Sequence, residues 1–433
     1  MGKVSIQPYK GTRDFYPEDK RLQDYIFGVW RSACASFGYQ EYDAPMIESL
    51  DLYRLKNQES SEIVNEQVYS FTDRGGREVA VRPEMTPSVS RMVAAKRQEL
   101  AYPLRLFSIP NLWRYERPQK GRLREHWQLN VDIFGVEGME AEHELVMIAS
   151  QIMEGFGASR DMYEVRYGSR AFMEDLLDYL GVDETLVNDI FGYIDRYKKY
   201  KSADDAAKAL KDILSTENIK NGLDQKLIQL LDTSDLKAYA DVLQTKGYRD
   251  LLEFSQMVES SGLENVRFDA SIVRGFAYYT GIVFEVFDTS PDNNRSLFGG
   301  GRYDGLVGAL GADPVPTAGF GKGDVTIVDF LRTHDLLSDL PNPTDIYVVL
   351  AGDVYEQAQQ LFMQLRIYGL KVAVDTSGRK ISKQIDAAAK AGARHVLFVG
   401  EDELREDSYE LLNLDTQQKQ RVAPDAILDA VSS

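Results

Sequence analysis

The sequence predicts an α+β fold built on an antiparallel sheet, with a helical insertion and a small α/β domain at the C-terminal end. Three observations support this fold class. Segments with strand alternation and hairpin turns run from residue 38 to 135 and return at residue 265. Between them, residues 174–262 are rich in lysine, aspartate, leucine and alanine at helical spacing. Beyond Pro343, strand-like and helix-like segments alternate, which favours a small parallel sheet.

The composition limits the class of protein. The chain has 433 residues, of which 43% are apolar and 27% are charged, enough to bury the cores of two or three domains. Its single cysteine, Cys34, excludes an intrachain disulfide, and its four histidines lack metal-ligand spacing, so we expect no zinc site. The N-terminal residues lack the apolar run of a secretion signal, and no stretch reaches the length of a membrane span. We therefore expect a cytoplasmic protein without a membrane partner.

An amphipathic helix is expected first, followed by strands. From Glu18 to Phe37, apolar residues recur at helical spacing and acidic residues occupy the first turn. Residues 38–53 and 67–86 then have the pattern of strands, and the pair Gly75-Gly76 predicts a hairpin turn between two of them.

A carboxylate lies where the last of these strands ends. Thr86 is a good N-cap and Pro87 suits the first position of a helix, so a helix is expected to begin there. Glu84 then lies just before the helix. Its carboxylate can serve a ligand, or it can simply interact with the backbone donors and the dipole of the helix.

Five cations are packed into eleven residues of a chain whose net charge is −18. The flanking segments, 104–116 and 124–135, have the pattern of strands, and Pro118 and Gly121 break it between them. The sequence therefore predicts a hairpin with its cations on the loop and the strand ends. A solvated basic surface is one interpretation, and a site for a concentrated anion, such as a triphosphate or a nucleic-acid end, is the other. The cations are Arg114, Arg117, Lys120, Arg122 and Arg124.

Polar residues alternate along the second strand of this hairpin. Gln128 and Asp132 are four residues apart, so both side chains lie on one face, together with those of His126 and Asn130. Such a face is a poor core face, and it predicts the floor of a pocket. The later segment GGGRYDGL lacks the ending of a phosphate loop and, taken alone, predicts a tight turn.

Several motifs together resemble the histidyl-tRNA synthetase family of class II aminoacyl-tRNA synthetases. The resemblance covers nearly the whole chain, and RPQKGR combined with the histidine-specific RGFAYYTG is its most specific part. The matching segments are KGTRDFYPED, GYQEYDAPMIE (motif one), RPEMTPSVSRMV, RYERPQKGRLREHWQLNVDIFG (motif two), RGFAYYTGIVFE and GGGRYDGL.

This resemblance implies a domain organisation and a reaction. It implies a catalytic core in two parts, a homodimer formed through motif one, and an anticodon-binding domain. The implied reaction joins L-histidine and ATP, with Mg²⁺ expected, into histidyl-adenylate and pyrophosphate, and then transfers histidine to the 3′ end of tRNA(His). The expected divisions are 1–173 and 263–335 for the core, 174–262 for the insertion, 336–343 for a linker and 344–433 for the anticodon-binding domain.

The resemblance also implies a role for individual residues. The residues implied to bind ATP are Arg114 at the α-phosphate, Arg122 at the outer phosphates, His126 at the adenine and Arg274 between the carboxylate and the α-phosphate. Arg114 and Arg274 are thereby the implied catalytic residues. The residues implied to bind histidine are Glu84, Thr86 and Gln128 at the α-amino group, Asp132 and Tyr279 at the imidazole, and Met85 and Tyr278 in the same pocket. The residues implied to meet the acceptor end of the tRNA are Arg117, Gln119 and Lys120.

Three positions depart from the pattern of the family. Asp132 stands where many members carry glutamate, and Ala277 replaces a common aspartate. Thr326 occupies the position in motif three that usually presents an arginine to ATP, although this GFGxGD form resembles an organellar and bacterial subgroup. Our hypothesis is that Arg122 or Lys322 supplies the missing charge.

A second function remains open at this point. Catalytic cores of this type also occur as regulatory subunits of ATP phosphoribosyltransferase, which sense histidine without charging tRNA. The loss of arginine at Thr326 favours that alternative. The intact arginines Arg114 and Arg122 and the long segment after Pro343 oppose it.

Overall fold

The chain folds into two compact units, Met1–Ser338 and Asp339–Ser433, which are described separately below. The computed structural model describes residues 5–54, 67–119, 121–200, 202–240, 244–273, 279–293, 296–337, 340 and 344–432.

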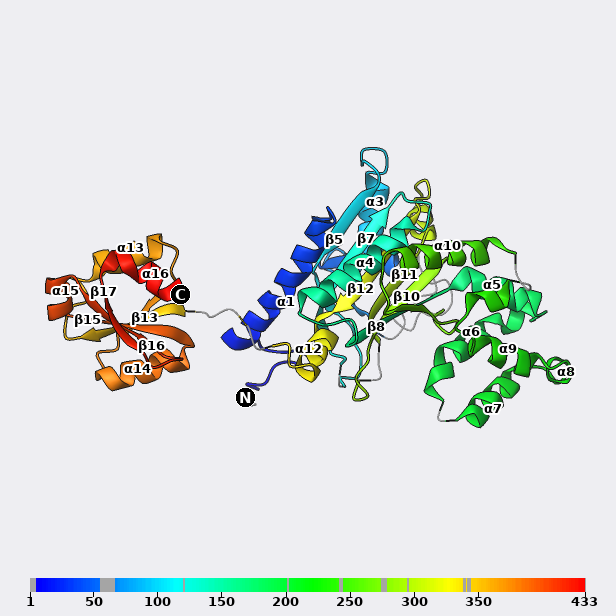
Figure 1. The fold of residues 1–433 in the computed structure, drawn as a ribbon. Helices are drawn as coiled ribbons and strands as arrows, with labels where there is room; N and C mark the ends of the chain where they lie inside the picture. The colour runs from blue at the N-terminus through cyan, green and yellow to red at the C-terminus, as the bar shows by residue number, and fades with distance from the viewer. Residues whose placement is uncertain are drawn as a thin grey trace. The chain divides into compact units, whose positions relative to one another are not determined.

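The larger unit is organised around a mainly antiparallel sheet, as the sequence predicts (Figure 1). Its strand order in the described residues is β1-β5-β7-β12-β11-β10-β8-β9, with β6 paired to one end of β7. Among the described strands of this sheet, only the outermost pairs, β1 with β5 and β8 with β9, are parallel. The bounds are β1 Gln40–Glu41, β5 Leu104–Ser108, β6 Asn111–Trp113, β7 Glu125–Phe134, β8 Tyr163–Ser169, β9 Val266–Phe268, β10 Ile282–Asp288, β11 Ser296–Arg302 and β12 Thr317–Gly323.

Helices cover one face of this sheet because each presents an apolar stripe. The predicted first helix is confirmed as α1 (Pro17–Ser36), and its Trp30 is completely buried. It packs against α4 (Glu140–Gly155), and both contribute to the core cluster that contains Val131 of β7. Burial of such side chains is the main source of stability. This packing holds the helices to the back of the central strands.

A second, three-stranded sheet has the order β2-β4-β3. Its hairpin turns at the predicted glycines, between β3 (Tyr69–Thr72) and β4 (Glu78–Val81). Residues 50–53, which we predict as strand, instead belong to the short helix α2 (Leu50–Arg54), whose Leu50 and Tyr53 pack together in a small core. The remaining strand, β2, spans Ile47–Ser49.

The helix after this sheet begins one residue earlier than predicted. In α3 (Thr86–Ala95) the N-cap is Met85, and Thr86 is already the first helical residue. No side chain caps this end of the helix. The predicted capping role of Thr86 is therefore wrong, and its hydroxyl is available for another purpose.

The helical texture predicted after residue 173 is also found in the structure. All the described elements between β8 and β9 are helical, and they form the group of green helices in Figure 1. Aromatic contacts bind this group to the sheet, including that of Phe254 with Tyr167 of β8. The main helices are α5 Arg170–Tyr179, α6 Val187–Arg196, α7 Ala203–Ile213, α8 Thr216–Lys220, α9 Leu223–Leu231 and α10 Lys246–Ser260.

The smaller unit contains the alternating strands and helices that we predict, but its sheet is mixed. The strand order is β14-β13-β15-β16-β17, and only the first three strands are parallel. A terminal hairpin, β16 and β17, adds antiparallel strands to the edge because a short turn can join only antiparallel neighbours. The bounds are β13 Thr344–Ala351, α13 Gln359–Ile367, β14 Val372–Val374, α14 Ile381–Lys390, β15 Ala393–Gly400, α15 Glu401–Glu406, β16 Tyr409–Asn413, β17 Lys419–Val422 and α16 Ile427–Ser432.

Candidate active site

A cavity of about 410 Å³, a volume that includes space open to solvent, lies over the central strands of the larger sheet. Polar residues of β7 and glycines of β11 and β12 form much of its lining. The start of α3 and the end of β6 add charged and hydroxyl side chains. The lining residues are Glu84, Thr86, Arg114, Gln128, Asn130, Asp132, Tyr279, Gly299, Tyr303, Gly319, Phe320 and Gly321.

The floor of the cavity depends on the pairing of β7 with β12. Each cavity-lining polar side chain of β7 lies opposite a glycine: Gly319 opposite Asp132, Gly321 opposite Asn130 and Gly323 opposite Gln128. A Cβ atom on Gly319 would clash with Asp132 and lie 3.0 Å from Oη of Tyr303, and one on Gly321 would clash with the amide of Gln128. These glycines therefore provide the space that the polar side chains and a ligand occupy.

Replacement of Gly321 by alanine is expected to raise the KM for the ligand of Gln128, which the family resemblance implies is histidine, by about tenfold. The new methyl group would displace the amide, and the loss of one hydrogen bond to a charged ligand has about this cost. Steady-state kinetics with varied histidine would measure it. Gly28→Ala in α1 is the matched control, because a Cβ there meets no atom within 4 Å. An unchanged KM in Gly321→Ala would contradict the prediction.

Asp132 and Tyr303 form a buried pair at one end of the floor. The Tyr303 hydroxyl donates a hydrogen bond to Oδ1 of Asp132. Asp132 is 3% exposed and Tyr303 is 2% exposed, so their interaction is shielded from water. The pair joins β7 to the segment directly after β11, and it presents a carboxylate to a ligand in the cavity.

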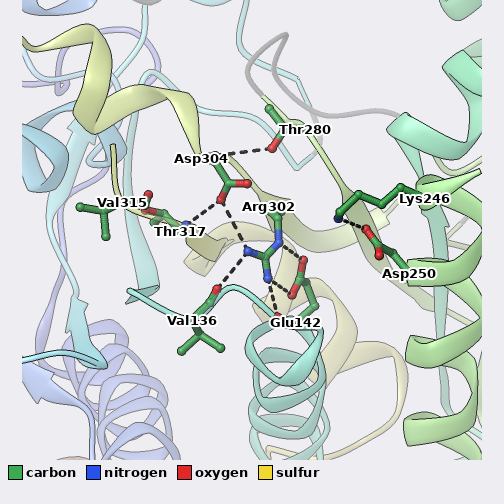
Figure 2. Close-up of polar contacts among 10 residues, drawn as sticks. Val136, Glu142, Lys246, Asp250, Thr280, Arg302, Asp304, Val315 and Thr317 are labelled. Carbon is green, nitrogen blue, oxygen red and sulfur yellow. Dashed lines mark hydrogen bonds and ion pairs between the residues drawn. The ribbon is translucent and has the colours of Figure 1, made fainter. Parts of the chain in front are cut away.

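A buried ion pair fixes the backbone next to Tyr303 (Figure 2). The guanidinium of Arg302 donates to both carboxylate oxygens of Glu142, at 2.6 and 2.7 Å, and to the carbonyl oxygens of Val136 and Gly138. On the other side of Tyr303, Asp304 accepts a hydrogen bond from the backbone N–H of Thr317, at 2.8 Å. The predicted tight turn is wrong here, since GGGR is the end of β11 and both neighbours of Tyr303 are anchored.

Arg114 forms a cationic wall beside Glu84 and Thr86. Its backbone N–H donates to the carbonyl of Arg124, and its Nε–H donates to the carbonyl of Pro83 at 2.9 Å. The second of these bonds orients the guanidinium plane. Because Glu84 is 5% exposed and Arg114 is half-buried, both charges lie in an environment partly shielded from water.

The predicted cationic hairpin divides into two kinds of residues. Arg117 and Gln119 are exposed, and so is Arg122, whose Nη1 lies 3.5 Å from a carboxylate oxygen of Glu116. Arg124 is buried, and its guanidinium lies 4.0 Å from the centroid of the Tyr115 ring. Four of the five predicted cations therefore remain candidates for an anion, and Lys120 among them lies outside the described residues.

His126 contributes a neutral ring. Burial lowers its pKa to about 3, and the positive charges of Arg114 and Arg13 act in the same direction. The imidazole is thus uncharged across the physiological pH range, which suits stacking on a flat aromatic ligand. His126 is half-buried and is not among the cavity-lining residues.

The hypothesis that Lys322 supplies the charge missing at Thr326 is wrong. Lys322 lies on the opposite face of β12 from the glycines that line the cavity, and its side chain is completely buried. Its Nζ lies 3.3 Å from the sulfur of Met153 and 4.2 Å from the centroid of the Phe298 ring. The hydroxyl of Thr326 is bonded to the carbonyl of Leu297 at 2.9 Å.

Lys322→Met is expected to stabilise the fold by about 2–4 kcal/mol at pH 7. Burial lowers the pKa of Lys322 well below its ordinary value, so the unfolded chain binds a proton that the folded chain excludes. The loss of folding free energy that Lys322 causes is greatest at pH values below its lowered pKa. It disappears as the pH rises toward about 10.4, the ordinary pKa of lysine in an unfolded chain. Denaturant unfolding should therefore show a smaller difference in the free energy of unfolding between Lys322→Met and the unmodified protein at pH 9.5 than at pH 7. The exposed Lys208→Met is the control, and equal stability of all three proteins at pH 7 would contradict the prediction.

The remaining predicted site residues have different positions. Met85 is completely buried, with its sulfur 4.0 Å from Nη1 of Arg82, and it does not line the cavity. Arg274 and Tyr278 lie outside the described residues. Sequence reasoning did not select Tyr303 or the paired glycines as site residues. The glycine run 299–301 and the alternation of glycine at 319, 321 and 323 are the signals that could have identified the paired glycines.

Two kinds of feature are absent from the described residues, a cluster of metal-binding side chains and a membrane-spanning helix. No group of three or more histidine, cysteine, aspartate or glutamate side chains is arranged to hold a metal ion in that part of the chain. Among the same residues, no helix is both long and apolar enough to span a membrane.

Comparison with known proteins gives a consistent result. Residues 11–322 match the family profile described as histidyl-tRNA synthetase, and residues 345–433 match an anticodon binding domain. A histidine–tRNA ligase from Leptospira biflexa is 43% identical over 420 residues, which cover 95% of this chain and 94% of that one.

Solved structures show the same fold. A histidyl-tRNA synthetase from Nostoc sp. superposes with a TM-score of 0.86 at 22% identity, covering 99% of both chains. A chain from Bacillus halodurans, described as an ATP phosphoribosyltransferase regulatory subunit/histidyl-tRNA synthetase, has a TM-score of 0.74 at 23% identity and covers 92% of this chain and 100% of its own. Fold alone therefore does not separate the two functions considered above.

Proposed function

The chain belongs to the histidyl-tRNA synthetase family, and on this basis we propose that its cavity activates histidine with ATP. The product is histidyl-adenylate, from which histidine passes to the terminal ribose of tRNA(His). The arrangement of charged and polar residues around the cavity supports this function. Arg114 and Glu84 stand at one wall of the cavity, and the buried Asp132–Tyr303 pair stands on its floor.

These groups suit the two ends of the amino acid. Glu84, Thr86 and Gln128 offer oxygen acceptors to the α-ammonium group, and all three line the cavity. Asp132 offers a carboxylate acceptor to an imidazole N–H, which apolar amino acids of similar size lack. A site that pairs a buried polar group with its substrate rejects analogues that leave the group unpaired. This feature is the proposed basis of specificity for histidine.

The chemistry requires no protein nucleophile. A carboxylate oxygen of histidine attacks the α-phosphorus of ATP, the bond to the β-phosphate oxygen breaks, and pyrophosphate leaves. Arg114 would place the two anions in line and stabilise the charge that develops on the phosphate oxygens. A planar guanidinium can hold two oxygens at once, which a lysine ammonium cannot.

Mg²⁺ belongs to the substrate in this proposal. The described residues contain no cluster of three metal-binding side chains, which is consistent with an ion held mainly by the phosphates of ATP. The predicted binding of Arg122 to the outer phosphates, of Arg274 to the α-phosphate and of Arg117, Gln119 and Lys120 to the tRNA end is retained as part of the proposal.

We further propose a cytoplasmic homodimer that binds tRNA through its smaller unit. The motif-one segment supports the dimer, since its Met46 and Ile47 are 45% and 49% exposed, and Phe71 of the same small sheet is 49% exposed. Exposed apolar side chains that lie together are typical of an interface. Sedimentation should give about twice the chain mass of 49.0 kDa. A species of the chain mass would reject the dimer.

The deciding experiment is histidine-dependent exchange of labelled pyrophosphate into ATP, followed by charging of tRNA(His). Both activities are expected. The competing function, a histidine-sensing regulatory subunit of ATP phosphoribosyltransferase, predicts histidine binding without either activity. Thr326, in place of the motif-three arginine, is the observation in its favour. A folded, dimeric protein that binds histidine but catalyses no exchange would replace our proposal with that one.

A further inference from the structure

The segment before α1 lies against the motif-two hairpin. The backbone N–H of Arg124 donates to the carbonyl of Gly11 at 2.9 Å, and Nη1 of Arg124 donates to the Tyr9 hydroxyl at 2.8 Å. Gly11 has a φ of +87°, and a Cβ atom there would lie 2.8 Å from Cγ of Arg124 and 2.9 Å from Cγ of Pro118. Glycine thus permits a close approach that fixes the path of the residues after it.

This path brings Arg13 to the start of the motif-three helix, α12 (Asp324–Thr333). Nη2 of Arg13 lies 2.6 Å from Oδ2 of Asp324, whose side chain is 4% exposed. The other carboxylate oxygen of Asp324 accepts the backbone N–H of Trp127 at 3.0 Å. The Phe15 ring lies 4.8 Å from the Arg13 guanidinium and packs edge-on against Trp127. Two contacts therefore hold Arg13 itself, and two more hold its partners Asp324 and Phe15 against Trp127, at the junction of β7 and α12.

The position of this junction relative to the cavity is defined by the sheet. Trp127 lies between His126 and the cavity residue Gln128, and Gln128 pairs with Gly323, the residue before Asp324. Thr326 lies two residues further along the same helix. The charges of Arg13 and Arg114 both lower the pKa of His126, so both guanidinium groups lie near enough to act on that ring.

Arg13 keeps donors that its partner does not use. Its side chain is 27% exposed, and Nε has no hydrogen-bond partner among the described residues. A guanidinium has five N–H donors in a rigid fork, so it can hold Asp324 with one edge and an anion with another. Asp324 is itself bonded twice, and it orients the cation.

Resting on the proposed function, we propose that Arg13 binds the triphosphate of ATP in place of the arginine that Thr326 does not provide. The guanidinium of Arg13 would contact the phosphates from the N-terminal segment, near the end of β12. The arginine usual in the family would instead contact them from the position of Thr326 in α12. Lys322 is excluded from this role by its burial on the opposite face. Arg13 would thereby be a substrate-binding residue of the activation step.

The test compares the affinities for MgATP and adenosine, measured by calorimetry without histidine. A phosphate contact changes the first affinity only, whereas a structural defect changes both. For Arg13→Gln, the ratio of the MgATP affinity to the adenosine affinity should fall by about tenfold to a hundredfold. Lys10→Gln is the matched control, since it removes the same charge from an exposed position on the same segment, and its ratio should stay within twofold.

A further comparison separates phosphate binding from the ion pair. In Asp324→Asn the cation remains without its partner, so the ratio should be equal to or above that of the unmodified protein. If Arg13→Gln does not fold, Arg13→Gln/Asp324→Asn is compared with Asp324→Asn, because the double variant leaves no buried charge unpaired. A ratio within twofold after loss of Arg13, or an equal fall in Lys10→Gln, would overturn the proposal. Absence of histidine-dependent exchange in the unmodified protein would instead reject the proposed function and leave this binding test valid.

Discussion

Arg114→Gln is expected to lower kcat for histidine-dependent pyrophosphate exchange by about 10²–10³-fold. The side chain lines the cavity, and the bond from its Nε–H to the Pro83 carbonyl orients the guanidinium before substrate arrives. A hydrogen-bond donor held in this way needs little reorganisation when charge develops on the α-phosphate. Glutamine preserves some of the length and hydrogen-bonding capacity but removes the charge and the fork.

Two comparisons make this prediction specific. Arg114→Lys retains the positive charge without the planar guanidinium, and its kcat should lie between those of the unmodified protein and Arg114→Gln. Arg77→Gln removes an arginine that is exposed at the turn of the β3–β4 hairpin and paired with Asp73, so its kcat should not change. Measurement of kcat at saturating ATP and histidine for all four proteins decides the matter. A kcat in Arg114→Gln within threefold of the unmodified protein would mean that Arg114 does not act in the chemical step.

Asp132→Asn is expected to lower kcat/KM for histidine by about 10²–10⁴-fold, with the KM for ATP changed less than threefold. The carboxylate is 3% exposed and accepts the hydroxyl of Tyr303. Asparagine has nearly the same shape, so the cavity should keep its volume. The loss therefore reports the charge and the acceptor that an imidazole N–H requires.

Tyr303→Phe separates specificity from packing. It removes the hydroxyl that holds Asp132 and keeps both the ring and the carboxylate, so we expect a smaller loss, of about tenfold, in kcat/KM for histidine. Exchange kinetics with varied histidine and varied ATP give all the required constants. The assignment of Asp132 to the imidazole fails if Asp132→Asn raises the KM for ATP as much as that for histidine.

The sequence was most informative where a local pattern determines a local structure. Apolar spacing from Glu18 to Phe37 predicted α1, and the Gly75-Gly76 pair predicted the β3–β4 turn. The alternation of Gln128, Asn130 and Asp132 predicted one polar face of a strand, and all three residues line the cavity. These results follow from periods of 3.6 and 2 residues, which are properties of a single segment.

Errors arose where a role depends on a partner distant in the sequence. Thr86 resembles an N-cap, yet its helix begins one residue earlier, with Met85 as the N-cap. Lys322 resembles a phosphate-binding cation within a glycine-rich segment, but its strand pairs so that the glycines face the cavity and the lysine faces α4. The residue type of Lys322 alone does not reveal on which side of its strand the ligand lies.

The sequence by itself therefore determined the family, the order of the elements and the polar strand at the centre of the site. Motifs such as RPQKGR and RGFAYYTG are local, so their information survives without coordinates. Only the tertiary structure decided which distant residues meet there. The contact of Tyr303 with Asp132 spans 171 positions and that of Arg13 with Asp324 spans 311. Such contacts result from the register of β7, β11 and β12 and from the burial of unlike charges together. Both are determined by the packing of the whole unit, not by any one segment.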